Sequence, residues 1–129
     1  MSSAEEKMTI EQAAEILEEM KDVFDVDQIG EGLPDILIRL IHRGRLHFDA
    51  ENYQISYDLI RPKSDIKTVT FKEPVARDWI PGAGQKDEDI ARKLYRLVQI
   101  STGLNPLAYG TIGLRDMTNM SAIFSAFFA

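Results

Sequence analysis

The fold is decided by residues 53–71, which read YQISYDLIRPKSDIKTVTF. Apolar and polar residues alternate over Tyr53–Leu59 and again over Thr68–Lys72. A period of two is typical of a strand with one buried face. Pro62–Asp65 separates the two runs as a turn, so this stretch predicts a β-hairpin. Because two strands alone are marginally stable in water, the hairpin must rest on helices or on the sheet of another subunit.

Two helices are predicted before the hairpin. Thr9 and Gln12 form a capping-box pattern, and apolar residues then recur at helical spacing as far as Phe24. A cluster of glycine and proline ends this first helix. Pro34 suits the first turn of a second helix, and Gly44 is placed to end it.

Two more helices are predicted after the hairpin. The segment Pro74–Gly84 leads to a helix that has Asp87 as its expected cap and Gly103 at its end. The last helix runs from about Leu114. We therefore expect an α+β fold with two N-terminal helices, a β-hairpin and a C-terminal pair of helices. All 129 residues fit one small domain.

Charge is unevenly distributed along the chain. Residues 1–35 hold eleven acidic and two basic side chains, a net charge of −9, whereas the whole chain carries −6. A net acidic protein is repelled by polyphosphate, so nucleic acid is not an expected partner. The acidic arm has two interpretations: it steers a basic protein partner, or it is a solvated helix face.

Several kinds of site are excluded by residue type and spacing. The chain has no cysteine, its two histidines, His42 and His47, have no third nitrogen ligand, and no phosphate-binding glycine loop occurs. Asp25–Gly30 resembles the start of a calcium loop, but its fifth and twelfth positions hold Ile29 and Ile36. We expect no cofactor, no metal and no catalytic residue.

The surroundings of the chain are also constrained. No apolar run approaches the roughly 20 residues that a membrane span requires, and residues 1–6 are unlike a secretory signal. These features predict a cytoplasmic protein with no membrane partner.

Arg39, His42, Arg43 and Arg45 form a small basic cluster. The cluster favours an ion pair with the acidic first helix inside the same molecule. The alternative is contact with nucleic-acid phosphate, although the cluster is short and lacks interleaved aromatic residues.

The C-terminal helix has an apolar stripe that is a candidate partner-binding surface: Met117, Met120, Phe124, Phe127 and Phe128. Large exposed apolar patches mark association sites, and on this interpretation the stripe binds a second copy of the chain or a client protein. The alternative interpretation is a core helix that packs within its own monomer.

Short motifs in residues Tyr57–Phe128 now line up in a recognisable order. Tyr57–Pro62 has the form of a strand that ends in Leu-x-x-Pro, and Val69–Pro74 has the form of a strand that ends in a basic residue, Glu and Pro. Thr102-Gly103-Leu104 follows a helix, and Ile112–Asp116 opens the last one. In this order and spacing the chain resembles the tail assembly chaperones of long-tailed phages related to P2 and Mu. Lys72 stands where that family usually has Arg, and Gly113 stands where a Ser would cap the helix.

The resemblance implies a non-virion protein of the infected host's cytoplasm. It implies that the chain binds and coats the tape measure protein during tail morphogenesis, with the chain itself as an oligomer partner and the tail tube protein as a further candidate partner. Residues 53–129 form the chaperone-like region, and residues 1–52 are an N-terminal helical region outside the resemblance. The alternative function is a small non-enzymatic regulatory module that uses Arg39–Arg45 on DNA.

Overall fold

The protein is described by a computed structural model that covers residues 8–63, 65–75 and 87–128. It has an α+β fold, as predicted, with helices at both ends and an antiparallel sheet between them. The elements are α1 (Ile10–Val23), α2 (Leu33–His42), β1 (Leu46–Asp49), β2 (Gln54–Lys63), β3 (Ile66–Phe71), α3 (Asp87–Thr102), α4 (Pro106–Tyr109) and α5 (Leu114–Phe127).

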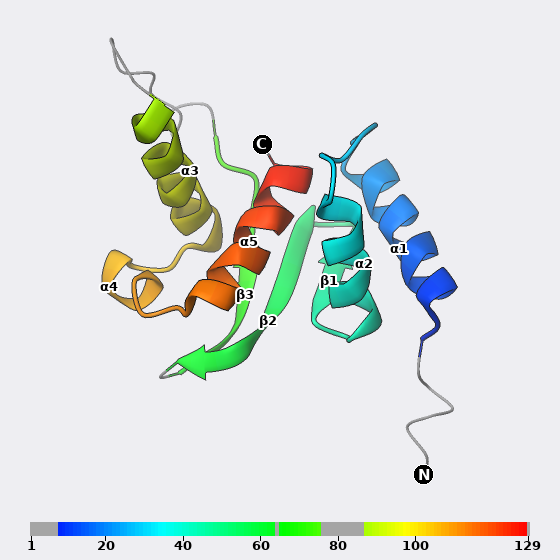
Figure 1. Cartoon of the computed structure of the whole chain (residues 1–129), viewed down its shortest axis with the longest axis horizontal. Helices are drawn as coiled ribbons and strands as arrows, with labels where there is room; N and C mark the ends of the chain where they lie inside the picture. The colour runs from blue at the N-terminus through cyan, green and yellow to red at the C-terminus, as the bar shows by residue number, and fades with distance from the viewer. Residues whose placement is uncertain (1–7, 64, 76–86, 129) are drawn as a thin grey trace.

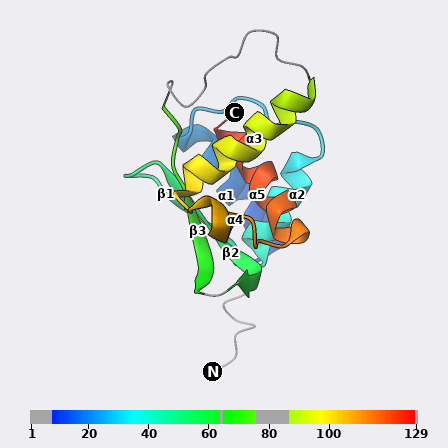
Figure 2. The same ribbon diagram turned by 90° about the vertical axis from the view of Figure 1, so that its left-hand side faces the viewer.

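The molecule has two layers (Figures 1 and 2). The sheet, in the order β1-β2-β3, forms one layer, and the longer helices form the other in the order α3, α5, α2, α1. The alternation of β2 puts Ile55, Tyr57 and Leu59 into the core beneath the helices. The opposite face is polar, where the Asp58 carboxylate accepts a hydrogen bond from Thr68 Oγ1 at 2.7 Å. The predicted hairpin therefore rests on helices of its own chain, and its stability needs no second subunit.

The predicted start of α1 and the predicted ends of α2 and α3 are confirmed, but α1 ends at Val23, before the cluster of glycine and proline that was expected to end it. Thr9 and Gln12 form the capping box of α1, with both reciprocal hydrogen bonds present. Gly44 and Gly103 follow α2 and α3 with φ of 75° and 73°, a left-handed conformation that glycine adopts without strain. Gly113 is the N-cap of α5. The segment 76–86, with its tryptophan, lies outside the described residues, and so does the side chain of the expected cap Asp87.

The sheet differs from the predicted hairpin in two respects. Residues 46–49, for which no strand was predicted, form a third strand that pairs with β2 in the register Leu46↔Tyr57 to Asp49↔Gln54. The observed turn is also shorter than the predicted turn Pro62–Asp65, because β2 continues through Pro62 to Lys63. Proline fits there because β1 pairs with β2 no farther than Tyr57, which leaves that side of β2 without a neighbouring strand.

A buried carboxylate on α5 binds this unpaired part of β2. Asp116 is only 1% exposed. Its Oδ1 accepts hydrogen bonds from the Tyr57 hydroxyl at 2.5 Å and the Ile60 amide at 2.7 Å, and its Oδ2 accepts from the Arg61 amide at 3.1 Å. Burial, and then the hydrogen bond to Asp116, raise the pKa of Tyr57, so its hydroxyl stays protonated and remains a donor. From the sequence, Asp116 was identified only as part of the motif Ile112–Asp116 that opens the last helix.

A second polar contact joins β3 to α3. Ser101 is buried near the end of α3, and its hydroxyl donates to the Lys72 carbonyl at 2.6 Å. The Lys72 amide donates in turn to the Ser101 carbonyl at 3.0 Å. The end of β3 is thereby held at the helix layer, just before Glu73 and Pro74.

Replacing Asp116 with Asn should lower the free energy of unfolding by about 1–3 kcal/mol. The substituted amide turns an N–H toward backbone or hydroxyl donors that need an acceptor. Urea titration followed by circular dichroism measures the change. The matched control is Asp22→Asn on the exposed face of α1, which should change stability by no more than about 0.5 kcal/mol. An Asp116→Asn chain as stable as the wild type would contradict this role.

Candidate functional site

The predicted partner-binding stripe on α5 lies largely inside the molecule. Met120, Phe124 and Phe127 are buried, and Met117 and Phe128 are partly exposed and pack against the core. Phe24, at the end of α1, meets the rings of Phe127 and Phe128 with centroid distances of 5.6 and 5.7 Å. This agrees with the alternative interpretation of the stripe as core. A partner surface formed by the exposed side chains of all five residues is not present in this fold.

Phe124→Ala should therefore destabilise the monomer, by about 3–5 kcal/mol, because it leaves a cavity in the core. Thermal or urea unfolding measures the loss. Leu114→Ala, on the same helix at a side chain that is 85% exposed, is the control and should have a small effect. If Phe124→Ala keeps the stability of the wild type and impairs only association, the stripe is an interface after all.

Two of the grooves in the part of the chain that the structure describes lie along α2. The first, which we call the α1–α2 groove, has a volume of about 780 Å³ and is lined by Met8, Ile10, Asp35, Ile38, Arg39, His42 and Arg43. The second, which we call the arginine groove, has a volume of about 410 Å³ and lies between α2, β2 and α5. Its lining residues are Ile36, Arg39, Leu40, Arg43, Arg45, Ile60, Arg115, Thr118 and Asn119. Arg39 and Arg43 line both grooves, so they form the ridge that separates them.

The α1–α2 groove combines an apolar floor with a charged rim. Ile10 is 57% exposed at the start of α1, and Met8 and Ile38 are partly exposed beside it. Asp35, Arg39 and Arg43 stand exposed around them. An apolar strip bordered by charges is the form of surface that receives one face of an amphipathic helix.

The arginine groove is strongly basic. Arg45 is fixed in place, since its Nη1 donates to the backbone carbonyls of Asp58 at 3.3 Å and Leu59 at 3.1 Å. At the side of the groove Asn119 Nδ2 donates to the Tyr57 hydroxyl at 2.9 Å, which connects the groove to the Asp116 network. Arg39, Arg43 and Arg115 are exposed and have no ion pair with any described residue.

The predicted internal pairing between this basic cluster and the acidic first helix is not found. Lys21 pairs with Glu18 at 3.4 Å and His47 with Asp58 at 3.3 Å, and among the residues that the structure describes no carboxylate of α1 pairs with Arg39, Arg43 or Arg45. The cause is the orientation of α1. Its apolar stripe, with Ala13, Leu17 and Met20, is buried against α2, so its carboxylates face away from the arginines.

The histidines and acids do not form a metal site in the described part of the chain. His42 is exposed on the rim of the α1–α2 groove, and His47 lies on the outer face of the sheet beside Asp58. No group of three potential ligands is found among these residues. Within the same residues no helix has the length and apolarity needed to cross a membrane.

Sequence reasoning missed Met8, Ile10, Ile38 and Arg115 as surface residues of interest. One signal for the grooves was present in α2, where Ile36 and Ile38 lie beside the buried residues Leu37, Leu40 and Ile41. A helix that is apolar on more than one side needs cover on more than one side. Arg115 carried no such signal, because only the fold brings it next to Arg45.

Comparisons with protein-family models, with curated proteins and with solved structures find no match for this chain. The functional proposal therefore rests on the fold, its two grooves and the resemblance of its motifs.

Proposed function

We propose that this chain is a phage tail assembly chaperone that binds and coats the tape measure protein in the host cytoplasm. One observation carries the proposal: motif pieces that are far apart in the sequence meet in the fold. Asp116, from the piece that opens the last helix, binds the strand piece Tyr57–Pro62. Lys72, from the second strand piece, binds Ser101, which immediately precedes Thr102-Gly103-Leu104. The order and spacing on which the resemblance depends thus correspond to one connected framework.

The buried polar residues support a protein that acts by binding. Asp116 and Ser101 are occupied by hydrogen bonds to the backbone or to Tyr57. Among the described residues every buried side-chain nitrogen and oxygen has a hydrogen-bond partner. These groups hold β2 and β3 to the helix layer. Polar side chains that remain exposed to a partner include Arg39 and Arg43, which line both grooves beside α2.

The client surface in this proposal is the α1–α2 groove. A tape measure protein offers long amphipathic helices, and an apolar strip of Met8, Ile10 and Ile38 between charged residues suits one turn after another of such a helix. Leu107 and Leu114 are more exposed than Ile10, but neither lines the two grooves beside α2. Repeated binding of a small protein along the client would keep its apolar faces covered.

Ile10→Asp should weaken binding to the tape measure protein at least about tenfold, because a charge replaces an apolar contact at the interface. The folded state should tolerate the change, since Ile10 is exposed and an acid in the first turn of a helix suits its dipole. Co-expression with a tagged tape measure protein, followed by calorimetry on the purified pair, measures the effect.

Leu107→Asp is the matched control for Ile10→Asp. Leu107 is also a large exposed apolar residue in the first turn of a helix, at 87% exposure, and it lies on α4 away from the groove. The Leu107→Asp chain should bind the client with the same affinity as the wild type. Wild-type chain that fails to bind the tape measure protein would overturn the function. If both variants lose binding to the same extent, or if neither does, the proposed function stands but the client binds at another surface than the α1–α2 groove.

The second candidate function, a regulatory module that contacts DNA through Arg39–Arg45, gains support from one observation. The arginines are free of internal ion pairs among the described residues, and Arg115 adds to them. An anionic partner is therefore favoured. The net charge of −6 argues against polyphosphate as that partner.

A further inference from the structure

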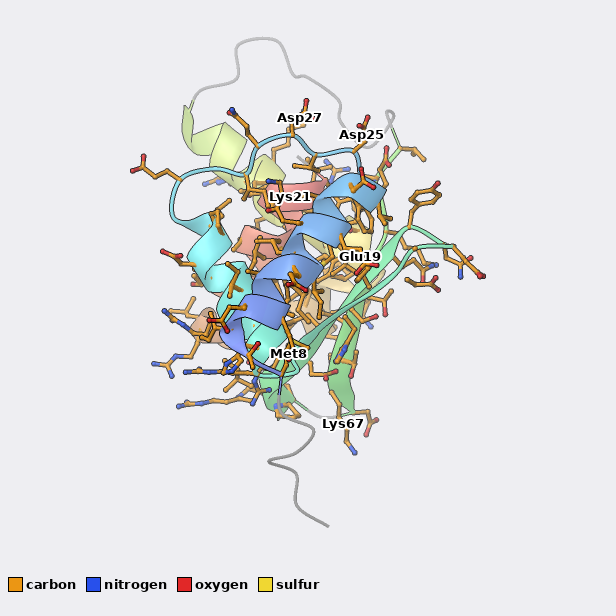
Figure 3. The ribbon with its side chains drawn as sticks, turned by 90° about the vertical axis from the view of Figure 1, so that its right-hand side faces the viewer. Met8, Glu19, Lys21, Asp25, Asp27 and Lys67 are labelled. Atoms are coloured by element: carbon orange, nitrogen blue, oxygen red, sulfur yellow. The ribbon has the colours of Figure 1, made fainter. Side chains whose placement is uncertain are left out.

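The exposed face of α1 is a row of carboxylates. Glu11, Glu15, Glu18, Glu19 and Asp22 are all exposed, and among the residues that the structure describes only Glu18 of these has a cation beside it, Lys21 at 3.4 Å. Figure 3 looks onto this helix, with Glu19 on its side and with Asp25 and Asp27 beyond its end. Like charges one helical turn apart destabilise a helix, as at Glu11 and Glu15 or Glu15 and Glu19. A row of cations brought against this face would remove that repulsion.

The arginine groove carries a concentration of positive charge, opposite in sign to the acidic face of α1. Arg39 lies in the last turn of α2 and Arg43, four residues later, is the C-cap of that helix, while Arg115 and Arg45 face the same groove from α5 and from the turn after α2. Arg115 stands in the first turn of α5, where the helix dipole disfavours a cation. Figure 3 shows nitrogen-tipped side chains gathered below α2 on a different side of the molecule from the outer face of α1. A row of carboxylates brought into this groove would neutralise it.

The two surfaces also agree in spacing. Arg39 and Arg43 are separated by four residues of helix, and so are Glu15 and Glu19, which gives each pair an axial separation of about 6 Å. Two helices packed side by side can therefore oppose both pairs at once. Within one molecule this is prevented, because α1 turns its apolar stripe toward α2.

We infer that the arginine groove of one copy binds the acidic face of α1 of a second copy. The two surfaces differ, so the contact is head-to-tail, and each added copy leaves one free groove and one free α1. Such a contact builds an open row, or a ring where the rotation between copies closes, instead of a twofold dimer. The inference deepens the self-association part of the proposed function by naming both surfaces, and its assay contains no tape measure protein.

A second copy fits the groove better than nucleic acid does. A second copy also carries a net charge of −6, so it is the local pattern of charge that favours it: α1 presents separate carboxylates at the spacing of the arginines, on a helix that can pack beside α2. Residues 1–35 carry most of the negative charge, so one copy approaching another by its first helix presents opposite charge to the groove.

Two neutralising variants test the contact. Arg39→Gln/Arg43→Gln removes the ridge charges, and Glu15→Gln/Glu19→Gln removes the matching carboxylates and also relieves repulsion within α1. Sedimentation velocity over a concentration series at low ionic strength should show wild-type species heavier than the 14.6 kDa monomer, and added salt should dissociate them. Each variant alone should associate at least about tenfold more weakly, a loss typical of removing close charge pairs from an interface. Circular dichroism should show that both remain folded.

Mixing the two variants is the decisive measurement. Each still carries one intact surface, so an equimolar mixture should form a pair of two chains and nothing longer. Three results overturn the inference: a wild-type chain that remains monomeric, a mixture that behaves as two separate variants, or association that only one of the two variants weakens. Tight wild-type binding to a DNA duplex that Arg39→Gln/Arg43→Gln abolishes, without self-association, would assign the groove to nucleic acid.

Discussion

The buried carboxylate of Asp116 is the interaction on which the rest of this structure depends. A carboxylate removed from water is tolerated only when hydrogen bonds replace its hydration, and in this fold Tyr57, Ile60 and Arg61 supply them. This requirement fixes the position of α5 along β2. It also occupies backbone donors on the part of β2 that β1 does not pair with, so the sheet does not offer them to another chain. Because α2 packs against α5, the same contact sets the walls of the arginine groove.

This framework leaves the protein with surfaces of different character. The outer face of the sheet is polar and internally hydrogen-bonded, as between Ser56 and Thr70 at 3.2 Å. The outer face of α1 is acidic, the arginine groove is basic, and the α1–α2 groove is apolar at its base. A small protein that must bind both a client and its own copies needs separate surfaces for the two tasks. We propose that the α1–α2 groove serves the client and the charged surfaces serve the copies, with Arg39 and Arg43 on the border.

Local signals in the sequence predicted most of the fold, and contacts between distant residues were beyond them. The alternation over Ile55–Leu59, the capping box at Thr9 and the glycines after α2 and α3 are each decided by a few neighbouring residues, and all are confirmed. Tyr53, predicted to begin the buried face of the strand, instead precedes β2 with a φ of 52° and is 59% exposed. Strand β1 has four residues, too few for its alternation to stand out, and it exists because β2 pairs with it.

Asp116 meets Tyr57 across 59 residues of sequence. The stripe of Phe124 and Phe127 was ambiguous, because a core helix and an interface helix have the same period. The basic cluster at Arg39–Arg45 and the acidic first helix were both identified from the sequence. Their predicted pairing is not found, because the apolar stripe of α1 packs against α2 and its carboxylates face away from the arginines.

The central claim is that the client lies in the α1–α2 groove, and backbone amide chemical shifts on adding a soluble helical fragment of the tape measure protein test it most directly. We predict that shift changes concentrate in residues 8–10 and 35–43, with α4 and the strand β3 unaffected. Changes centred on α3, α4 or the outer face of the sheet would contradict the assignment of the surface. A spectrum that does not change at saturating fragment would contradict the proposed function itself.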